Sequence, residues 1–198
     1  MSHLSESILH HAASLPEGGA LSAKGLLHLG ARPAVDQALS RLVRRGHLLR
    51  AGRGLYTRPI RTRFGSRPPT LETLVEGLAR AKGETLVPHG AAAANALGLT
   101  TQVPVRTVYL TSGRTRTLQL GAQQIELRHA PAWQLMFPGA PAGEAVRALA
   151  WLGEAKAGEA MRHLRRVLPP SALAQIADAR TRMPTWLAAQ VSRLIAHA

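Results

Sequence analysis

The sequence contains no cysteine, few aromatic residues (3 Trp, 2 Tyr and 2 Phe) and only 11 acidic residues among 198. Without cysteine, disulfides, thiolate zinc sites and cysteine nucleophiles are excluded, and a reducing cytoplasm is the simplest expected compartment. No apolar run approaches the ~18 residues of a membrane span. The first fifteen residues also lack the apolar core of a signal peptide. We therefore expect a cytoplasmic protein without a membrane partner.

The scarcity of acids leaves a formal net charge of +14 at pH 7. The charge is uneven along the chain: residues 1–67 hold 11 Lys and Arg against 3 acids, and residues 68–198 hold 14 against 8. Such a balance favours a polyanionic partner, with nucleic acid first and an anionic membrane surface second.

Residues 32–45 form the most regular segment of this basic region. Pro33 suits the first turn of a helix and Gly46 suits the left-handed position that ends one. At 100° per residue, the apolar residues share one side of the helix: Val35, Ala38, Leu39, Leu42 and Val43. The polar residues gather on the opposite side: Gln37, Ser40, Arg41 and Arg44.

The flanking segments predict a winged helix-turn-helix over residues 1–58. Residues 2–14 predict a first helix, and residues 23–29 predict a short second helix capped by Ser22. After Gly46, a Gly-flanked turn (AGRG) joins two short strands of a basic hairpin. Three helices followed by such a hairpin are typical of a winged helix, with the helix-turn-helix at residues 22–45.

This arrangement assigns DNA contacts by position. Gln37, Ser40, Arg41 and Arg44 would face a major groove, where Arg pairs with guanine and Gln with adenine. A second set would contact phosphates, which position the protein without reading sequence: Arg45, Arg50, Arg53 and Arg58. The alternative is that the arginines form an ordinary solvated helix face.

Residues 59–69 carry arginine, proline and glycine without periodicity, which predicts a basic linker. A basic arm that follows a DNA backbone or enters a minor groove is the alternative.

Residues 70–198 predict a mixed α+β domain with a C-terminal helical tail. Thr70 can cap a helix, residues 85–87 and 105–110 resemble strands, and TLQL and QIELRH alternate around Gly121 as a hairpin does. From residue 143 onward the apolar spacing is helical. The whole chain is therefore expected to be α+β.

The sequence offers little support for metal or enzyme chemistry. Nine histidines are scattered, and His10 and His11 point about 100° apart on a helix, so no metal site and no cofactor are expected. No nucleophile elbow, P-loop or close pair of acids is present, so we expect no enzymatic activity. Arg114, Arg116 and Arg128 form either a second basic patch across the hairpin or a solvated sheet face.

Three stretches together resemble the AbiEi-type antitoxins of type IV toxin–antitoxin systems, which act in abortive infection against phage. These are LSRLVRRGHLLRAGRGLYTRP, VPHGAAAANALGLTTQVPVRTVYLTSG and RTLQLGAQQIELRHAP, within residues 39–131. The resemblance implies a winged helix that binds inverted repeats in its own promoter and represses transcription, with two copies on the operator. It also implies that residues 70–198 counter a nucleotidyltransferase-like toxin without forming a stable complex with it.

Two other classes of protein compete with this interpretation. A transcription regulator with a ligand-sensing second domain would need a pocket with convergent polar groups. A nucleic-acid-processing enzyme would need clustered carboxylates or a histidine-centred site.

Overall fold

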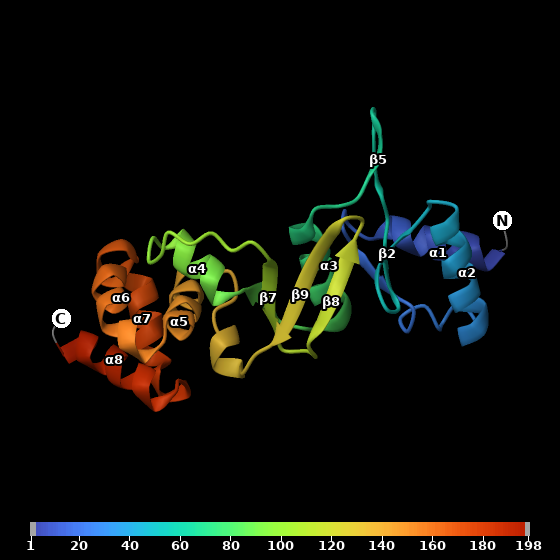
Figure 1. Ribbon diagram of the computed structural model, residues 1–198. Coiled ribbons are helices and arrows are strands. Elements are labelled where there is room, and N and C mark those ends of the chain that lie inside the picture. Colours follow the sequence, from blue (N-terminus) through green and yellow to red (C-terminus); the bar gives the residue numbers. More distant parts are fainter. Residues whose placement is uncertain (1–2, 197–198) are drawn as a thin grey trace. The chain divides into compact units, whose positions relative to one another are not determined.

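The structure, a computed structural model, describes residues 3–196, and its chain forms two compact units (Figure 1). Unit 1 comprises the chain up to Glu84 together with Arg116–Ile125. Unit 2 comprises Thr85–Thr115 and the chain from Glu126 onward. Helices and strands occur in both units, so the expected α+β class is confirmed.

Unit 1 is built around two helices and a three-stranded sheet. Helices α1 (His3–Ser14) and α2 (Arg32–Arg44) pack on each other, and strands β1 (Ala20–Ser22), β3 (Leu55–Thr57) and β2 (Leu49–Gly52) are ordered β1-β3-β2. β3 is antiparallel to both neighbours, with Leu21 opposite Tyr56. The order is helix, strand, helix and hairpin, which differs from the expected three helices and a hairpin but is compatible with a winged helix.

The boundaries of α2 agree with the sequence signals. Pro33 lies in the first turn, and Gly46 adopts φ +71°, where the His47 amide donates to the Leu42 carbonyl. This bond closes the helix in a Schellman-type end. Leu39 and Leu42 are fully buried against α1 and the β1 region, and each burial stabilises the unit by roughly 1.5–3 kcal/mol.

The expected second helix does not form. Residues 23–28 are turns, with i→i−3 bonds such as Leu29 N–H to Leu26 O in place of helical ones. Ser22 does cap the segment, because its Oγ accepts from the Gly25 amide at 2.9 Å. Seven residues that include a glycine gain too few helical bonds to repay helix nucleation. Leu26 is buried without a regular helix.

The expected linker is also structured. β4 (Ile60–Thr62) and β5 (Gly65–Arg67) pair as an antiparallel hairpin that projects from unit 1 (Figure 1). We call residues 60–67 the arm. The alternating Ile60-Arg61-Thr62 and the turn glycine Gly65 (φ +118°) supply the hairpin pattern that the linker assignment overlooked.

The compact units do not divide at residues 59–69 as expected. Helix α3 (Leu71–Lys82), capped by Thr70, belongs to unit 1 and packs on β1. A Cβ at Gly77 would overlap the Gly18 carbonyl oxygen, so the helix and the strand approach more closely than any other residue permits. Unit 1 is completed by the tip of the predicted hairpin, which consists of β8 (Arg116–Leu120) and the start of β9 (Gln123–His129). Leu118 of β8 lies against Gly52 of β2.

Unit 2 combines a small sheet with the predicted helical tail. β6 (Leu86–Pro88) pairs antiparallel with β7 (Thr107–Thr111), and β9 is the other neighbour of β7. α4 (Gly90–Ala96) packs on α5 (Pro141–Leu152). The remaining elements are η1 (Ala132–Leu135), α6 (Glu154–Val167), α7 (Pro170–Asp178), η2 (Arg180–Arg182) and α8 (Thr185–Ala196). Their core is continuous and includes Leu149, Leu164 and Leu187, all fully buried.

Candidate nucleic-acid interface

The four residues assigned to base reading lie together on the solvent side of α2. Gln37, Ser40, Arg41 and Arg44 are all exposed, which confirms the expected orientation of the helix. Arg41 Nη2 donates to Gln37 Oε1 at 2.6 Å, so the two side chains are held side by side one turn apart. A guanidinium beside a carboxamide presents hydrogen-bond donors and an acceptor close together, which suits the edges of base pairs.

Ser40 is engaged with its own helix. Its hydroxyl donates to the Asp36 carbonyl at 2.9 Å, and the Asp36 carboxylate pairs with Arg32 at 2.8 Å. Both contacts neutralise or engage the first half of α2 and leave its second half, with Arg41, Arg44 and Arg45, as the cationic end. Basic side chains there also interact favourably with the helix dipole, which is the structural alternative to DNA contact.

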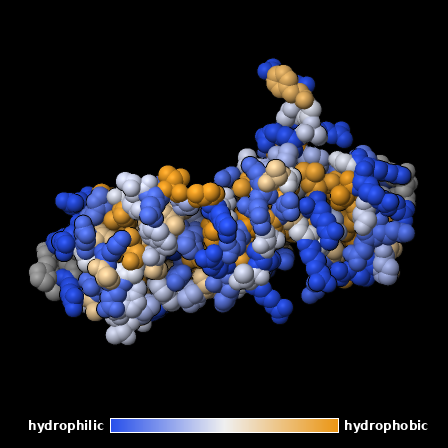
Figure 2. Space-filling model, viewed as in Figure 1, coloured by the Kyte–Doolittle hydropathy of each residue, from blue (hydrophilic) through white to orange (hydrophobic). Residues whose placement is uncertain are grey.

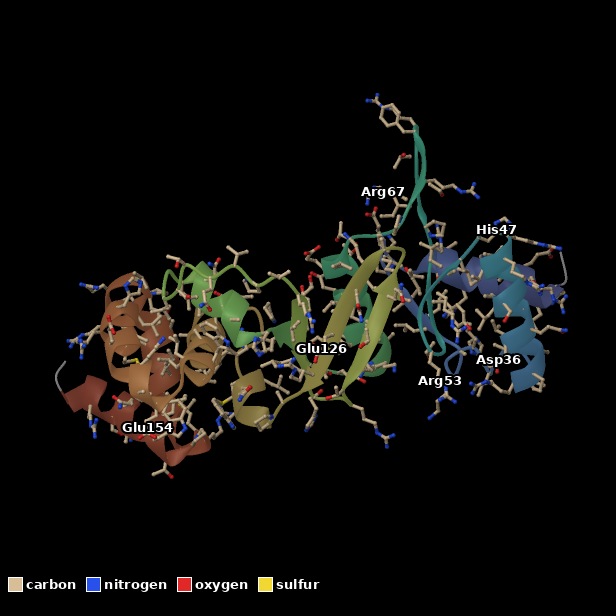
Figure 3. The ribbon with its side chains drawn as sticks, viewed as in Figure 1. Asp36, His47, Arg53, Arg67, Glu126 and Glu154 are labelled. Carbon is tan, nitrogen blue, oxygen red and sulfur yellow. The ribbon has the colours of Figure 1, made fainter. Side chains whose placement is uncertain are left out.

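The β2–β3 hairpin carries two of the expected phosphate contacts. Arg50 is exposed and its Nε donates to the Gly52 carbonyl at 3.3 Å, where the strand register shifts. Arg53 occupies the turn and its side chain points away from unit 1 into solvent (Figure 3). Gly54 (φ +66°) provides the left-handed residue that this tight turn needs.

Arg58 has a contact that the sequence did not reveal. Its Nη1 donates to the carbonyl of Ala12 at 3.3 Å, near the C-terminal end of α1. The side chain therefore ties the segment after β3 to α1. Its expected role at a phosphate stays a prediction.

The second basic patch is divided and largely neutralised. Arg116 belongs to unit 1 and pairs with Glu84 at 2.5 Å, with both side chains mostly buried. Arg114 and Arg128 belong to unit 2, where Arg128 pairs with Glu126 at 2.9 Å. Arg116 and Arg128 thus have carboxylate partners, which reduces the positive charge that they offer to an anion.

The strongest electrostatic feature extends beyond the residues predicted from the sequence. Residues 37–71 contain nine arginines and no acidic residue. All nine are exposed: Arg41, Arg44, Arg45, Arg50, Arg53, Arg58, Arg61, Arg63 and Arg67. Three of them lie on the arm, where the linker assignment had missed a structured site. This arginine surface is the candidate site for a polyanion.

Unit 2 has a separate cavity of about 550 Å³. Pro88, Val105 and Val108 give it apolar walls, and His89, Arg106 and Tyr109 add polar groups. Nδ1 of His89 accepts from the Ala91 amide at 3.2 Å and so caps α4. Burial, reinforced by the nearby Arg128, lowers the pKa of His89 against the opposing effect of Glu126. The neutral imidazole is therefore favoured, which is the form that can accept this bond.

Arg147 is the most unusual charged residue of unit 2. It is 1% exposed, and its Nη1 donates to the Met136 carbonyl at 3.4 Å. Its Nε and Nη2 have no hydrogen-bond partner among the described residues. Burial lowers the pKa of Arg147, while Glu144 opposes that change. The sequence pattern placed this residue on a helix without indicating that it is buried.

Neither a metal cluster nor a spanning helix is found within residues 3–196. No three His, Asp or Glu side chains of that part of the chain gather as a possible metal site. Its helices are too short or too polar to cross a bilayer.

The fold and these side chains together define a two-unit α+β protein with nine exposed arginines in an acid-free run of sequence on unit 1. The chain belongs to a family of unknown function, DUF6088, whose model matches residues 7–174. No curated protein and no solved structure matches the chain.

Proposed function

We propose that the protein is a DNA-binding repressor of its own promoter and the antitoxin of a type IV toxin–antitoxin system. The observation that carries the DNA-binding role is the acid-free run of nine exposed arginines over α2, the β2–β3 hairpin and the arm. α2 contributes the Gln37–Arg41 pair for base reading, and Arg53 at the hairpin turn contributes a phosphate contact. The protein acts in the cytoplasm and needs no catalytic step.

The repressor role is tested with duplex DNA from upstream of the protein's own coding sequence. In a gel-shift titration against a scrambled duplex, the double variant Arg41→Ala/Arg44→Ala should lose selectivity for the promoter. Each bidentate base contact discriminates by about 1–3 kcal/mol, so two lost contacts reduce selectivity by at least roughly 30-fold.

Arg80→Ala is the matched control. Arg80 is an exposed helical arginine of unit 1, but it lies on α3 beside Glu76 at 3.8 Å and outside the arginine surface. Its loss should leave selectivity unchanged. Unaltered selectivity in the double variant would refute the assignment of α2 as the reading helix.

The antitoxin role rests on the resemblance of residues 39–131 to AbiEi-type antitoxins. Its partner would be a nucleotidyltransferase-like toxin encoded in the same operon, countered without a stable complex. Co-expression with that neighbouring protein should restore growth, and pull-down should recover no complex. Inverted repeats in the promoter would take two copies of the protein, which the stoichiometry of the DNA complex measures.

A second candidate is a transcription regulator with a ligand-sensing second unit, favoured by the cavity of about 550 Å³ in unit 2. Its polar groups, including His89 and Arg106, suit a small anionic or hydrogen-bonding effector. A small molecule that alters promoter affinity in wild-type protein and not in Arg106→Ala would favour this alternative.

A further inference from the structure

Two hydrogen bonds of Thr62 define the turn at the tip of the arm. Ile60 pairs with Arg67 and Thr62 with Gly65, so the turn at the tip holds Arg63 and Phe64. The Thr62 hydroxyl donates to the Gly65 carbonyl at 2.9 Å and accepts from the Phe64 amide at 3.2 Å. These two bonds fix the turn, so little conformational entropy is lost when the tip binds a partner.

The tip carries a large apolar group into solvent. Phe64 is 86% exposed, and all residues from Arg61 to Pro68 are exposed. Figure 2 shows the same feature as an isolated apolar tip with hydrophilic side chains beside it. A lone two-stranded hairpin is marginal in water, and a phenylalanine that is 86% exposed buries almost no apolar area to stabilise it. The side chain is therefore explained by a binding partner rather than by folding.

The charge of the arm indicates what kind of partner this is. Arg63 lies at the tip, its guanidinium 4.6 Å from the centre of the Phe64 ring, and Arg61 and Arg67 lie on the two strands behind it. Minor-groove proteins use an apolar wedge flanked by arginines to separate adjacent base pairs and to bind the phosphates on either side. Strands of three residues span roughly 10 Å, enough to enter a groove about 7.5 Å deep.

We infer that the arm enters the minor groove of duplex DNA and that Phe64 inserts between base pairs and bends the duplex. This inference rests on the proposed DNA-binding function and adds a second contact to it. Arg53 and the arm leave unit 1 in opposite directions (Figure 3), so the arm contacts DNA outside the segment bound by the β2–β3 hairpin.

An anionic membrane is the other partner that arginine and phenylalanine suit. Duplex DNA is favoured because the arm continues the acid-free arginine run of α2 and the β2–β3 hairpin. A single phenylalanine also buries too little apolar area to hold a protein on a bilayer.

The test uses the full chain and a promoter duplex of about 30 base pairs, a few times the ~10-base-pair helical repeat. The duplex is labelled at both ends for energy transfer, with 2-aminopurine at successive positions. Wild-type protein should bend the duplex by about 20–90° and raise 2-aminopurine fluorescence at one step. Phe64→Ala should abolish both signals and weaken binding about tenfold, whereas Phe64→Trp should keep them.

Val103→Ala is the matched control, because it also truncates a largely exposed apolar side chain but lies in unit 2 and outside its cavity. It should leave bending and affinity unchanged. A second variant, Arg61→Ala/Arg67→Ala, should weaken binding and lower the salt slope by about two units.

Each result separates the arm from the rest of the interface. Bending that survives Phe64→Ala overturns the inference, even if Arg41→Ala/Arg44→Ala still loses selectivity and the proposed function stands. Loss of bending in Phe64→Ala with unaltered selectivity in the Arg41/Arg44 variant supports the arm and refutes the reading role of α2.

Phe64-dependent binding to phosphatidylserine vesicles, with no bending of DNA, assigns the arm to a membrane and overturns the inference. Wild-type protein that binds no duplex overturns both proposals.

Discussion

The close approach of α3 to β1 allows a quantitative test of unit 1. In Gly77→Ala the new methyl group overlaps the carbonyl oxygen of Gly18 and lies 3.0 Å from the amide nitrogen of Ala20. Both neighbours are backbone atoms, so the helix must retreat from the strand by about 1 Å to restore ordinary contact. Leu74 and Leu78, which are fully buried on the same face, lose packing when it does.

Two opposing effects set the size of the change. Overpacking costs about 1–3 kcal/mol, whereas alanine gains up to about 1 kcal/mol over glycine inside a helix. Because the added methyl group meets backbone atoms that cannot rotate away, the overpacking cost takes the upper part of its range, and the net expectation is a loss of about 1–2 kcal/mol from the free energy of unfolding of unit 1. For a unit of roughly 90 residues this corresponds to a fall in Tm of about 5–15 °C.

Gly158→Ala is the matched control, because Gly158 lies inside α6 and its added methyl would meet only Gln190 Oε1 at 3.6 Å. That variant should gain about 0.5–1 kcal/mol. Hydrogen exchange followed by mass spectrometry measures the two units separately, so each change is assigned to its own unit. If Gly77→Ala is as stable as wild type, the argument for close packing of α3 against β1 is refuted.

Three further predictions concern single side chains. Arg53→Ala should weaken binding to all duplexes alike and lower the salt slope by about one unit; a change in sequence preference would contradict a phosphate role. The pKa of His89 is lowered on folding, so the unfolded chain binds a proton on this residue more readily than the folded chain does. The contribution of His89 to the stability of unit 2 should therefore be complete above about pH 6.5 and decrease as the pH falls further. His89→Asn, which can still accept the Ala91 amide, should reduce that loss in acid-dependent urea unfolding, and an unchanged pH profile would reject the assignment. Arg147→Met should raise the free energy of unfolding of unit 2 by about 1–3 kcal/mol, since it removes buried donors without partners, and a decrease would show that the guanidinium stabilises the fold.

Local signals predicted what local interactions determine. The extent of α2 could be predicted from the sequence because its apolar residues repeat over several turns and because Pro33 and Gly46 mark its two ends. The Thr70 cap and the hairpin turn at Gly121 were predicted for the same reason. In each case the residues that decide the structure lie within a few positions of one another.

Other features depend on contacts that the sequence pattern does not reveal. Ala23 and Leu26 have helical spacing and are buried in the core of unit 1, yet the short segment that holds them forms turns. Leu118 joins unit 1 through Gly52, more than sixty positions earlier in the chain. Periodicity gives the buried side of an element but not its partner, so the division into units could not be predicted.

The candidate site was predicted only incompletely. The orientation of Arg41 and Arg44 follows from the helical period, and the structure confirms it. The carboxylate partners of Arg116 and Arg128 and the contact of Arg58 with Ala12 depend on tertiary packing. A basic arm was the alternative to a linker, but its hairpin was not predicted because the three prolines and four arginines of residues 58–69 obscured a three-residue alternation.

The division of unit 1 into two stretches of sequence has a consequence for synthesis of the protein. The chain leaves unit 1 after Glu84 and returns with Arg116–Ile125, so the ribosome must add about forty residues before the unit is whole. At bacterial and eukaryotic elongation rates this takes about 2–8 s. During that interval Gly52 of β2 lacks its neighbour Leu118. A nascent chain therefore completes unit 1, which carries all nine exposed arginines, only after Ile125 has been added.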